Sequence, residues 1–333
     1  MKLFVYEHIT SGALASQALP TRLAEEGDAM LIAIVQDLSE IPQLEITLLR
    51  DYRLAPMVNH TDNIPLQYYW VNNAKQFSHQ WQQCLAETEL VFVIAPETEQ
   101  QLTLLQQDIL DHDKFYLGCS QQSTSICSDK LLCYQHLSAH KLPTPNTVNA
   151  ALWMIEKNIH TTTKFIVKPF DGAGCLDTLL FESSQSVQLY LATLSADKLA
   201  LQVVQPYISG KPISLCLFIS NNEIILLSIN TQNIDHQTQH LIFKNSTVNT
   251  LSETEFSRLK AQKIAEDICD AIPGLWGFVG IDLVLSSSGP VIIEVNPRMT
   301  SSYIHLKETV SFNPATLLIE KMHELTNKKL VFL

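Results

Sequence analysis

Apolar segments and helical segments alternate along the first 118 residues, and this alternation restricts the fold more than any other feature of the chain. The apolar segments are residues 2–6, 45–49, 89–95 and 114–118, and the helical segments are 21–38, 74–87 and 97–110. Strands separated by helices of this length predict a parallel sheet wrapped by helices. Ligands of such sheets bind at the carboxyl ends of the strands, which directs attention to "EHITSG" (7–12) and "APETE" (95–99).

The composition predicts a folded protein that acts on small molecules. With 46% hydrophobic and 17% charged residues over 333 positions, the chain is long enough for two or three domains with real cores. Its net charge of -12 and its lack of any run of Lys and Arg argue against nucleic acid or an anionic membrane as the main partner. No stretch reaches the roughly 18 uninterrupted apolar residues of a membrane span.

The start of the chain and its cysteines indicate a cytoplasmic protein. "MKLFVYEHIT" has the lysine and the short apolar run of a signal peptide, but Glu7 and His8 interrupt that run too early, so we predict a first strand there. The seven cysteines form no C-x-x-C pair, and we find no zinc-site spacing to histidine for Cys119, Cys127, Cys133 and Cys175. We therefore interpret them as reduced thiols. A catalytic cysteine is an open alternative, but no spacing supports it.

A mixed α+β part begins close to residue 118. Ser128 is predicted to cap a helix that carries Lys130 in its first turn and ends at "KLPTP". A lysine there is unfavourable against the helix dipole, although a solvated lysine is an ordinary alternative. Apolar segments at 164–169, 199–219 and 223–230, a helix at 254–272 and two paired strands at 277–285 and 290–297 follow, with no internal repeat.

The segment "VIIEVNPRMTS" (291–301) places Glu294, Asn296 and Arg298 at every second position of an otherwise apolar strand. Because successive side chains of a strand point to opposite faces, the apolar residues between them are predicted to face the core. These apolar residues are Val291, Ile293 and Val295. The polar face suits the floor of a site better than a solvated surface.

Turn residues "SSSG" and Pro290 join this strand to the preceding one, which predicts a hairpin. If Leu285 pairs with Val291, Asp282 lies directly opposite Glu294, with Cβ atoms about 4.5–5.5 Å apart. Two such carboxylates repel each other unless a cation lies between them, and Mg²⁺ prefers hard oxygen ligands. Asp282, Glu294 and Asn296 are therefore predicted to hold Mg²⁺ or Mn²⁺. The alternative is an antiparallel sheet with one wet face, which would suit Asp282 alone.

"FIVKPFDGAGC" places Lys168 at the end of an apolar strand, followed by Gly172 and Gly174. Glycines let backbone N–H groups approach a phosphate, and lysine supplies a compact charge for it. The sequence has neither a P-loop nor a dinucleotide-binding fingerprint, so by itself "DGAG" is better explained as an ordinary loop.

Taken in order, Lys130, Lys168, "VVQPYI" and the carboxylate hairpin resemble the ATP-grasp enzymes. The resemblance covers residues 119–333, and residues 1–118 are similar to the Rossmann-like pre-ATP-grasp domain that supplies a substrate surface. It implies an α/β domain followed by an α+β ATP-grasp fold whose two lobes clamp ATP. The small lobe would span about 140–208, and the large lobe about 209–333 together with the 119–139 helix.

The resemblance also implies roles for individual residues. Lys130, Lys168 and the loop with Gly172 and Gly174 match the groups that hold phosphates. "VQPYI" matches the hinge that holds adenine, with Gln205 near the exocyclic amine and the backbone of Ile208 near the ring. The hairpin residues Asp282, Glu294 and Asn296 match the magnesium ligands. Arg298 matches an arginine that meets the transferring phosphoryl group, so Arg298 and Lys168 are the catalytic candidates.

This sequence departs from the family pattern in the hinge. Gln205 or Pro206 stands where relatives often have a glutamate, and "SGKPISL" lacks the acid expected at the ribose. The metal ligands therefore match the family pattern, whereas the adenine and ribose contacts depart from it.

The implied activity is transfer of the γ-phosphate of ATP to a carboxylate, followed by attack of an amine on the acyl phosphate to give an amide, ADP and phosphate. "FVYEHITSGA" resembles the tyramine–glutamate ligases of methanofuran biosynthesis, which implies L-glutamate and tyramine as substrates. Glu7, Ser11, Gly12 and Tyr303 would then line the substrate cleft, with Glu7 holding the amine and Tyr6 or Tyr303 packing against its ring. A loop role for Glu7 is equally expected.

Two other classes stay open. One is a dipeptide-type ligase or carboxylase of the same family, and the other is a nucleotide-binding module without turnover. The oligomeric state, including a homodimer, also stays open.

Overall fold

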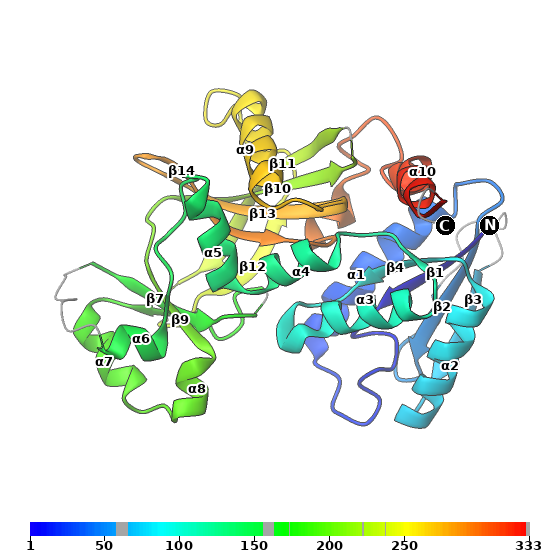
Figure 1. Cartoon of the computed structure of the whole chain (residues 1–333), viewed down its shortest axis with the longest axis horizontal. Helices are drawn as coiled ribbons and strands as arrows, with labels where there is room; N and C mark the ends of the chain where they lie inside the picture. The colour runs from blue at the N-terminus through cyan, green and yellow to red at the C-terminus, as the bar shows by residue number, and fades with distance from the viewer. Residues whose placement is uncertain (58–65, 156–162, 173, 222, 237, 331–333) are drawn as a thin grey trace.

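The computed structural model describes residues 1–57, 66–155, 163–172, 174–221, 223–236 and 238–330. It contains one parallel sheet and two antiparallel sheets, which follow one another along the chain (Figure 1). No helix in these ranges is long and apolar enough to cross a membrane.

The N-terminal part is the predicted parallel sheet, with strand order β3-β2-β1-β4-β5. Its elements are β1 (Lys2–Glu7), α1 (Thr21–Leu38), β2 (Glu45–Asp51), β3 (Leu66–Val71), α2 (Ala74–Glu87), β4 (Leu90–Ile94), η1 (Thr98–Gln100), α3 (Gln101–Asp111) and β5 (Phe115–Tyr116). Strand β3 was not predicted, because its polar Gln67 and only partly buried aromatic residues form an edge strand without a buried apolar run.

Two helices, rather than the single predicted helix, follow the sheet: α4 (Gln121–Ser128) and α5 (Lys130–Ala139). The N-cap of α5 is Asp129, whose carboxylate accepts hydrogen bonds from the backbone of Leu131 and Leu132. The prediction that Ser128 caps this helix is therefore wrong, since Ser128 ends α4. The same capping makes Lys130 the first residue of α5.

A small lobe carries the first antiparallel sheet, with strand order β6-β9-β7-β8. Its elements are β6 (Val148–Asn149), α6 (Ala150–Ile155), β7 (Phe165–Pro169), β8 (Leu179–Phe181), α7 (Ser184–Leu191), α8 (Ala196–Ala200) and β9 (Gln202–Pro206). Helices α6 and α7 share a core with this sheet, which includes Trp153, Val167 and Val187.

The second antiparallel sheet has strand order β12-β11-β10-β13-β14. Its elements are β10 (Lys211–Ile219), β11 (Ile224–Asp235), β12 (Ile242–Thr247), α9 (Arg258–Ala271), β13 (Gly277–Ser286) and β14 (Gly289–Asn296). Helix α9 packs against one face of this sheet. Strand β11 runs five residues beyond its predicted end at Asn230, and β12 was not predicted.

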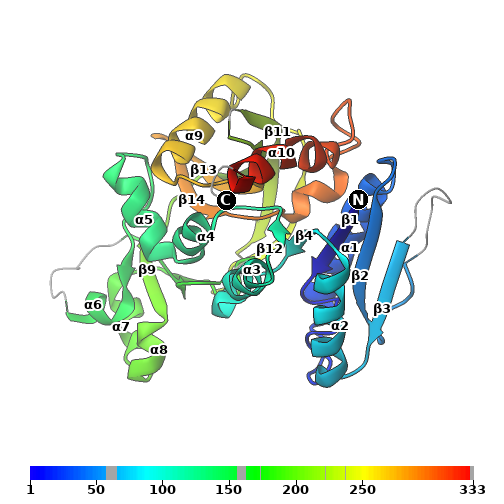
Figure 2. The ribbon, with the colours of Figure 1, turned by 45° about the vertical axis from the view of Figure 1, so that its right-hand side comes forward.

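The C-terminal segment returns to the N-terminal sheet through η2 (Ser301–His305) and α10 (Thr316–Leu330), drawn in orange and red in Figure 2. The hydroxyl of Tyr303 donates a 2.7 Å hydrogen bond to Asp37 of α1. One hydrophobic core includes Val5 of β1, Phe278 of β13 and Leu318 of α10. The parallel sheet and the last sheet are therefore held together by shared packing, and the active-site candidates lie beside this junction.

Candidate active site

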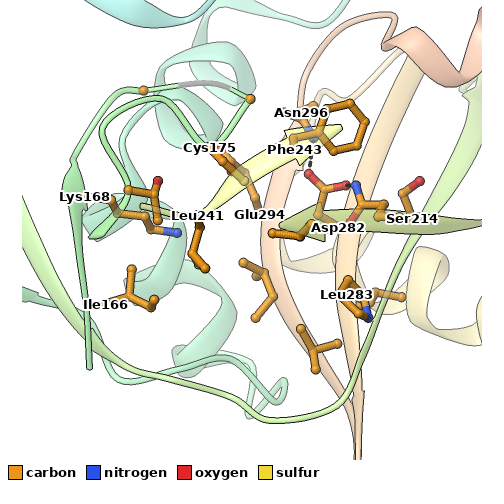
Figure 3. A pocket seen from close by; sticks show the side chains of 18 of the residues that line it. Ile166, Lys168, Cys175, Ser214, Leu241, Phe243, Asp282, Leu283, Glu294 and Asn296 are labelled. Atoms are coloured by element: carbon orange, nitrogen blue, oxygen red, sulfur yellow. Dashed lines mark hydrogen bonds between the residues drawn. The ribbon is translucent and has the colours of Figure 1, made fainter. Parts of the chain in front are cut away.

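A cavity of about 360 Å³ lies between the small-lobe sheet and the last sheet (Figure 3). Ile166 and Lys168 of β7 line one side of it, while Asp282 of β13 and the polar residues of β14 line the other. The cavity therefore collects polar side chains from both lobes.

The two carboxylates predicted to share a cation do lie on adjacent strands, and Asp282 is paired with Glu294. The turn is one residue tighter than expected, because Leu285 pairs with Pro290 rather than with Val291. A β-bulge restores the alignment: Leu283 pairs with Ile292, so Ile293 is the extra residue on β14.

The bulge also changes which side chains face the core. Ile292 and Val295 are 2% and 1% exposed, whereas Ile293 lines the cavity and Val291 is only partly buried. The prediction that Val291 and Ile293 face the core with Val295 is therefore wrong. Only Val295 keeps its predicted side, because strand alternation resumes after the extra residue.

Asp282 is surrounded by amides. Its carboxylate accepts hydrogen bonds from Nε2 of Gln232 at 2.7 Å and from Nδ2 of Asn296 at 3.1 Å. Burial, together with the neighbouring charge of Glu294, raises the pKa of Asp282 to about 6 in spite of these bonds. Two partly buried acids on adjacent strands favour positive charge beside them.

Lys130 and Lys168 supply the positive charge of the cavity. Nζ of Lys130 lies 3.0 Å from Oε1 of Glu294 and also donates to the carbonyl of Gly172. Burial opposes ionisation of Glu294, but the two lysines hold its pKa below the ordinary value. Burial lowers the pKa of Lys168 despite the attraction of Glu294. The lysines therefore face the same space as the carboxylates.

The donor set fits a hard divalent cation. Among the described residues, no three His, Cys, Asp or Glu side chains form a metal-binding group. The predicted set is instead two carboxylates, Asp282 and Glu294, with the amide of Asn296 as a neutral oxygen donor. Mg²⁺ is ordinarily bound by one or two carboxylates together with phosphate oxygens. The arrangement is thus compatible with a cation that binds together with a phosphate ligand.

The glycine-containing loop lies over the cavity. Gly172 and Gly174 line it, Gly174 has a φ of +62°, and Ala173 between them lies outside the described residues. Cys175 also lines the cavity, and burial raises the pKa of its thiol to about 11. The thiol is therefore protonated at neutral pH, and the thiol is a weaker nucleophile than the thiolate.

The hinge residues Gln205 and Ile208 line the cavity. The hydroxyl of Thr147 donates to the carbonyl of Pro145 at 2.9 Å and accepts from Nε2 of Gln205 at 2.7 Å. These bonds orient the amide of Gln205 so that its oxygen is left without a partner among the described residues.

Arg298 lines the cavity but is bound from the N-terminal part. Its Nε and one terminal nitrogen donate to the two carboxylate oxygens of Glu97 at 2.8 and 2.9 Å. The backbone N–H of Glu99 donates to Asp171 of the glycine-containing loop at 2.8 Å. The predicted segment "APETE" after β4 therefore contacts both the arginine and the loop.

The four residues predicted to line a substrate cleft do not line the cavity. Glu7 is 3% exposed, and its Oε2 accepts hydrogen bonds from the backbone and the hydroxyl of Thr10, both at 2.6 Å. Ser11 is buried and donates to the carbonyl of His8. Gly12, with a φ of +90°, packs against Val71, where any Cβ would clash.

Tyr303 is 1% exposed, and its hydroxyl is bound to Asp37. Tyr6 is buried against Phe4 and Trp81. These two rings cannot pack against a substrate in this structure, because both belong to hydrophobic cores. Glu7, Ser11, Gly12 and the two tyrosines thus do not line the cavity, and their predicted substrate contacts stay a prediction.

The residues at or beside the cavity that had no predicted role include Glu26, Gln232 and Glu97. Glu97 lies in a segment that the strand-end rule selects, so that signal was present. Glu26 lies within a helix and Gln232 near the end of a strand, and neither position carries a local motif. Only the packing of distant elements brings them to the site.

With this geometry established, comparison with known proteins defines the family. An ATP-grasp domain matches residues 127–302, and a pre ATP-grasp 3 domain matches residues 44–124. The chain belongs to the ATP-grasp family. This confirms the predicted fold class, a Rossmann-like pre-ATP-grasp domain followed by an ATP-grasp domain.

Similar proteins agree with this assignment. The chain is 26% identical over 326 residues to the tyramine–L-glutamate ligase of Methanocaldococcus jannaschii, covering 96% of this chain and 89% of the relative. An ATP-grasp superfamily protein from Archaeoglobus fulgidus has a TM-score of 0.69 at 20% identity, covering 96% of this chain and 88% of that one. D-alanine–D-alanine ligase from Bacillus anthracis, in complex with ATP, has a TM-score of 0.62 at 13% identity, covering 99% of both chains. These two structures show likeness of fold.

Proposed function

We propose that the protein is an ATP-dependent ligase that joins a carboxylate to an amine through an acyl phosphate, releasing ADP and phosphate. The observation that carries this proposal is the cavity of the ATP-grasp fold, which brings Lys130, Lys168, Arg298 and the Asp282–Glu294 pair around one space. Residues 1–118 would form the pre-ATP-grasp substrate domain, and residues 119–333 the ATP-grasp domain.

The residues of the cavity divide between the two ends of the nucleotide. The phosphates would be held by Lys130, Lys168 and the loop with Gly172 and Gly174. The oxygen of Gln205, which Thr147 keeps oriented, suits the exocyclic amine of adenine, with the Ile208 backbone beside the ring. Asp282, Glu294 and Asn296 would hold Mg²⁺, or Mn²⁺, which supplies positive charge beside phosphate oxygens.

Phosphoryl transfer depends on positioning and charge neutralisation more than on a protein nucleophile. A substrate carboxylate oxygen bonds to the γ-phosphorus as the bond to ADP breaks. The amine, which arrives as a cation, loses one proton to solvent and attacks the acyl carbon as the neutral base. Phosphate then leaves, and the nitrogen releases its second proton to solvent as the amide forms. Arg298 would face the transferred group, where its planar donors suit phosphate oxygens.

We propose L-glutamate as the carboxylate substrate and tyramine as the amine, in the synthesis of a methanofuran-type cofactor. The support is the similarity to the tyramine–L-glutamate ligase of Methanocaldococcus jannaschii, which extends over 96% of this chain. The free thiols of all seven cysteines fit the reducing cytoplasm.

The test is release of ADP from Mg·ATP with L-glutamate, measured with and without tyramine and against a panel of amino acids. We expect ADP and phosphate in equal amounts, dependent on tyramine, and a γ- or α-linked amide by mass spectrometry. Lys168→Ala should impair ATP use, because a charge facing phosphate is lost. Stoichiometric AMP would overturn the acyl-phosphate route.

The pattern of amine dependence separates the remaining possibilities. Strong turnover with an amino acid in place of tyramine would indicate a dipeptide-type ligase. Nucleotide binding without turnover in the presence of any amine would indicate a non-catalytic module.

A further inference from the structure

Glu26, in the second turn of α1, is the one residue before Lys130 among the described residues that line the cavity. The carboxylates of Glu97, Glu294 and Glu26 together raise the pKa of Arg298 against the effect of burial. Glu26 and Arg298 both line this cavity, and α1 packs against η2, which follows Arg298 in the chain. Both residues therefore lie where the parallel sheet meets the ATP-grasp fold.

Three buried or partly buried acids near this part of α1 already have partners. Glu97 forms a two-point ion pair with Arg298. Asp28 is paired with Arg50 through both carboxylate oxygens. Glu7 is buried beneath α1 and bound to Thr10.

Glu26 differs from these acids because its carboxylate has no hydrogen bond or ion pair with any described residue, and it is half-buried. Arg298 does not neutralise it, since the positive charge of that arginine is already balanced by Glu97. Glu26 is thus a carboxylate at the cavity without a cationic partner among the described residues, and a cation is the chemical complement of such a group.

We propose that Glu26 is the amine-binding residue of the ligase and that it recognises the ammonium group of the acceptor. This rests on the proposed function, because an acceptor amine is needed only if an amide is formed. A primary alkyl amine is a cation at neutral pH, with a pKa near that of lysine, about 10.4. An unpaired carboxylate inside the cavity would bind it by a charge-assisted hydrogen bond.

The neighbouring cavity wall suits the same ligand. Thr300, Ser301 and Ser302 line the cavity after Arg298, and the hydroxyls of Thr300 and Ser302 share a 2.9 Å hydrogen bond. Hydroxyl oxygens can accept the remaining N–H groups of an ammonium ion without adding charge. Glu26 would supply the negative charge, and the hydroxyls of residues 300–302 would supply neutral hydrogen-bond acceptors.

The test compares Glu26→Gln with wild type, using Mg·ATP, L-glutamate and tyramine. We expect the KM for tyramine to rise by about tenfold or more, with the KM values for ATP and L-glutamate changed by less than about twofold. Glu25→Gln is the matched control, because Glu25 is the exposed neighbour on the same helix and carries the same charge. It should leave all three KM values unchanged.

A binding measurement isolates the ammonium group. Tyramine and its hydroxyl analogue 4-(2-hydroxyethyl)phenol differ chiefly in this charge, so wild type should bind tyramine more tightly, and Glu26→Gln should lose most of that preference. If Glu26→Gln keeps the wild-type preference and tyramine KM, the proposal is overturned. Wild type that binds tyramine through Glu26 without releasing ADP would instead reject the ligase activity and retain the amine site.

Discussion

Glu97 and Arg298 lie 201 positions apart in the chain and form a two-point ion pair, with N–O distances of 2.8 and 2.9 Å. Glu97 follows β4 of the parallel sheet and is 4% exposed, while Arg298 follows β14 and lines the cavity. A carboxylate bound by both arms of a guanidinium fixes the plane of that group. The N-terminal domain therefore sets the orientation of the arginine that we expect at the transferred phosphoryl group.

Replacing Glu97 with glutamine should lower kcat by about tenfold or more while changing the KM for ATP by less than about twofold. The amide offers only one acceptor oxygen, so the guanidinium loses its fixed plane but the nucleotide contacts remain. Steady-state kinetics of ADP release with both substrates saturating measures the effect.

The control is Glu99→Gln, which removes the same charge from the same loop. The side chain of Glu99 is exposed, and only its backbone N–H binds Asp171. If Glu97→Gln and Glu99→Gln both retain wild-type kcat, Glu97 does not position Arg298.

Replacing Glu294 with glutamine should weaken Mg·ATP binding or turnover by about tenfold, equivalent to about 1.4 kcal/mol. The change removes one of the two carboxylates that would hold the cation and also the ion pair with Lys130. A magnesium titration of activity and a nucleotide-binding assay together measure it. Glu255→Gln is a suitable control, because Glu255 is exposed and paired with Lys211 outside the cavity. Identical magnesium curves for wild type and Glu294→Gln would exclude this cation site.

Cation binding should weaken as the pH falls through about 6. Burial and the charge of Glu294 raise the pKa of Asp282 to about 6, so its carboxylate is increasingly protonated below that value. A protonated acid loses most of its affinity for Mg²⁺, and bound Mg²⁺ in turn favours the ionised form. We expect a higher apparent dissociation constant for Mg²⁺ at pH 5.5 than at pH 7.5, measured with ATP present. Asp282→Asn should bind Mg²⁺ weakly at both pH values and should not show this change in affinity with pH. If Asp282→Asn keeps the full change, another group is responsible for the pH dependence.

Much of the fold could be predicted from residue patterns, because the apolar runs of β1, β2 and β4 and the helical periodicity of α1 and α2 are local signals. Strand β3 could not, since an edge strand needs no continuous apolar run. The β-bulge at Ile293 was also invisible, because neither Pro nor Gly marks it and the pairing with β13 creates it. Asp282 does pair with Glu294 as predicted, because the turn is one residue shorter than expected and the bulge adds one residue to β14.

The residues of the candidate site also include some that local motifs indicate and others whose position depends on tertiary packing. Lys168, Glu294 and Asn296 stand on strands beside recognisable motifs, and the structure brings them to the cavity as predicted. Glu7 and Tyr303 also stood in suggestive motifs, but burial decides their roles, and burial depends on helix α1 packing against both. Glu26 reaches the cavity through that same helix. The sequence around an acid within a helix does not show whether its carboxylate will have an ion-pair partner in the folded protein.

The last prediction concerns the stability effect of buried Glu7. Gly27 of α1 packs directly on its carboxylate, since a Cβ at that position would lie 2.6 Å from Oε1. Burial raises the pKa of Glu7 from its ordinary 4.5 to about 7, although bonds from Thr10 oppose the shift. The folded state therefore favours the neutral acid. The free energy of unfolding falls on account of Glu7 as the pH rises from 4.5 to 7, and this loss is constant above pH 7.

Glu7→Gln keeps the shape and remains neutral, so it should stabilise the protein at pH 8.5 by up to about 3 kcal/mol. The gain should shrink at pH 5.5, where most wild-type molecules already hold the proton in the folded state. Thermal unfolding of wild type and Glu7→Gln at both pH values measures this difference, with exposed Glu25→Gln as the control for charge removal near α1. A stabilisation that is equal at both pH values would show that Glu7 does not titrate in this range. A loss of stability at pH 8.5 would show that the ionised form is the one the fold prefers.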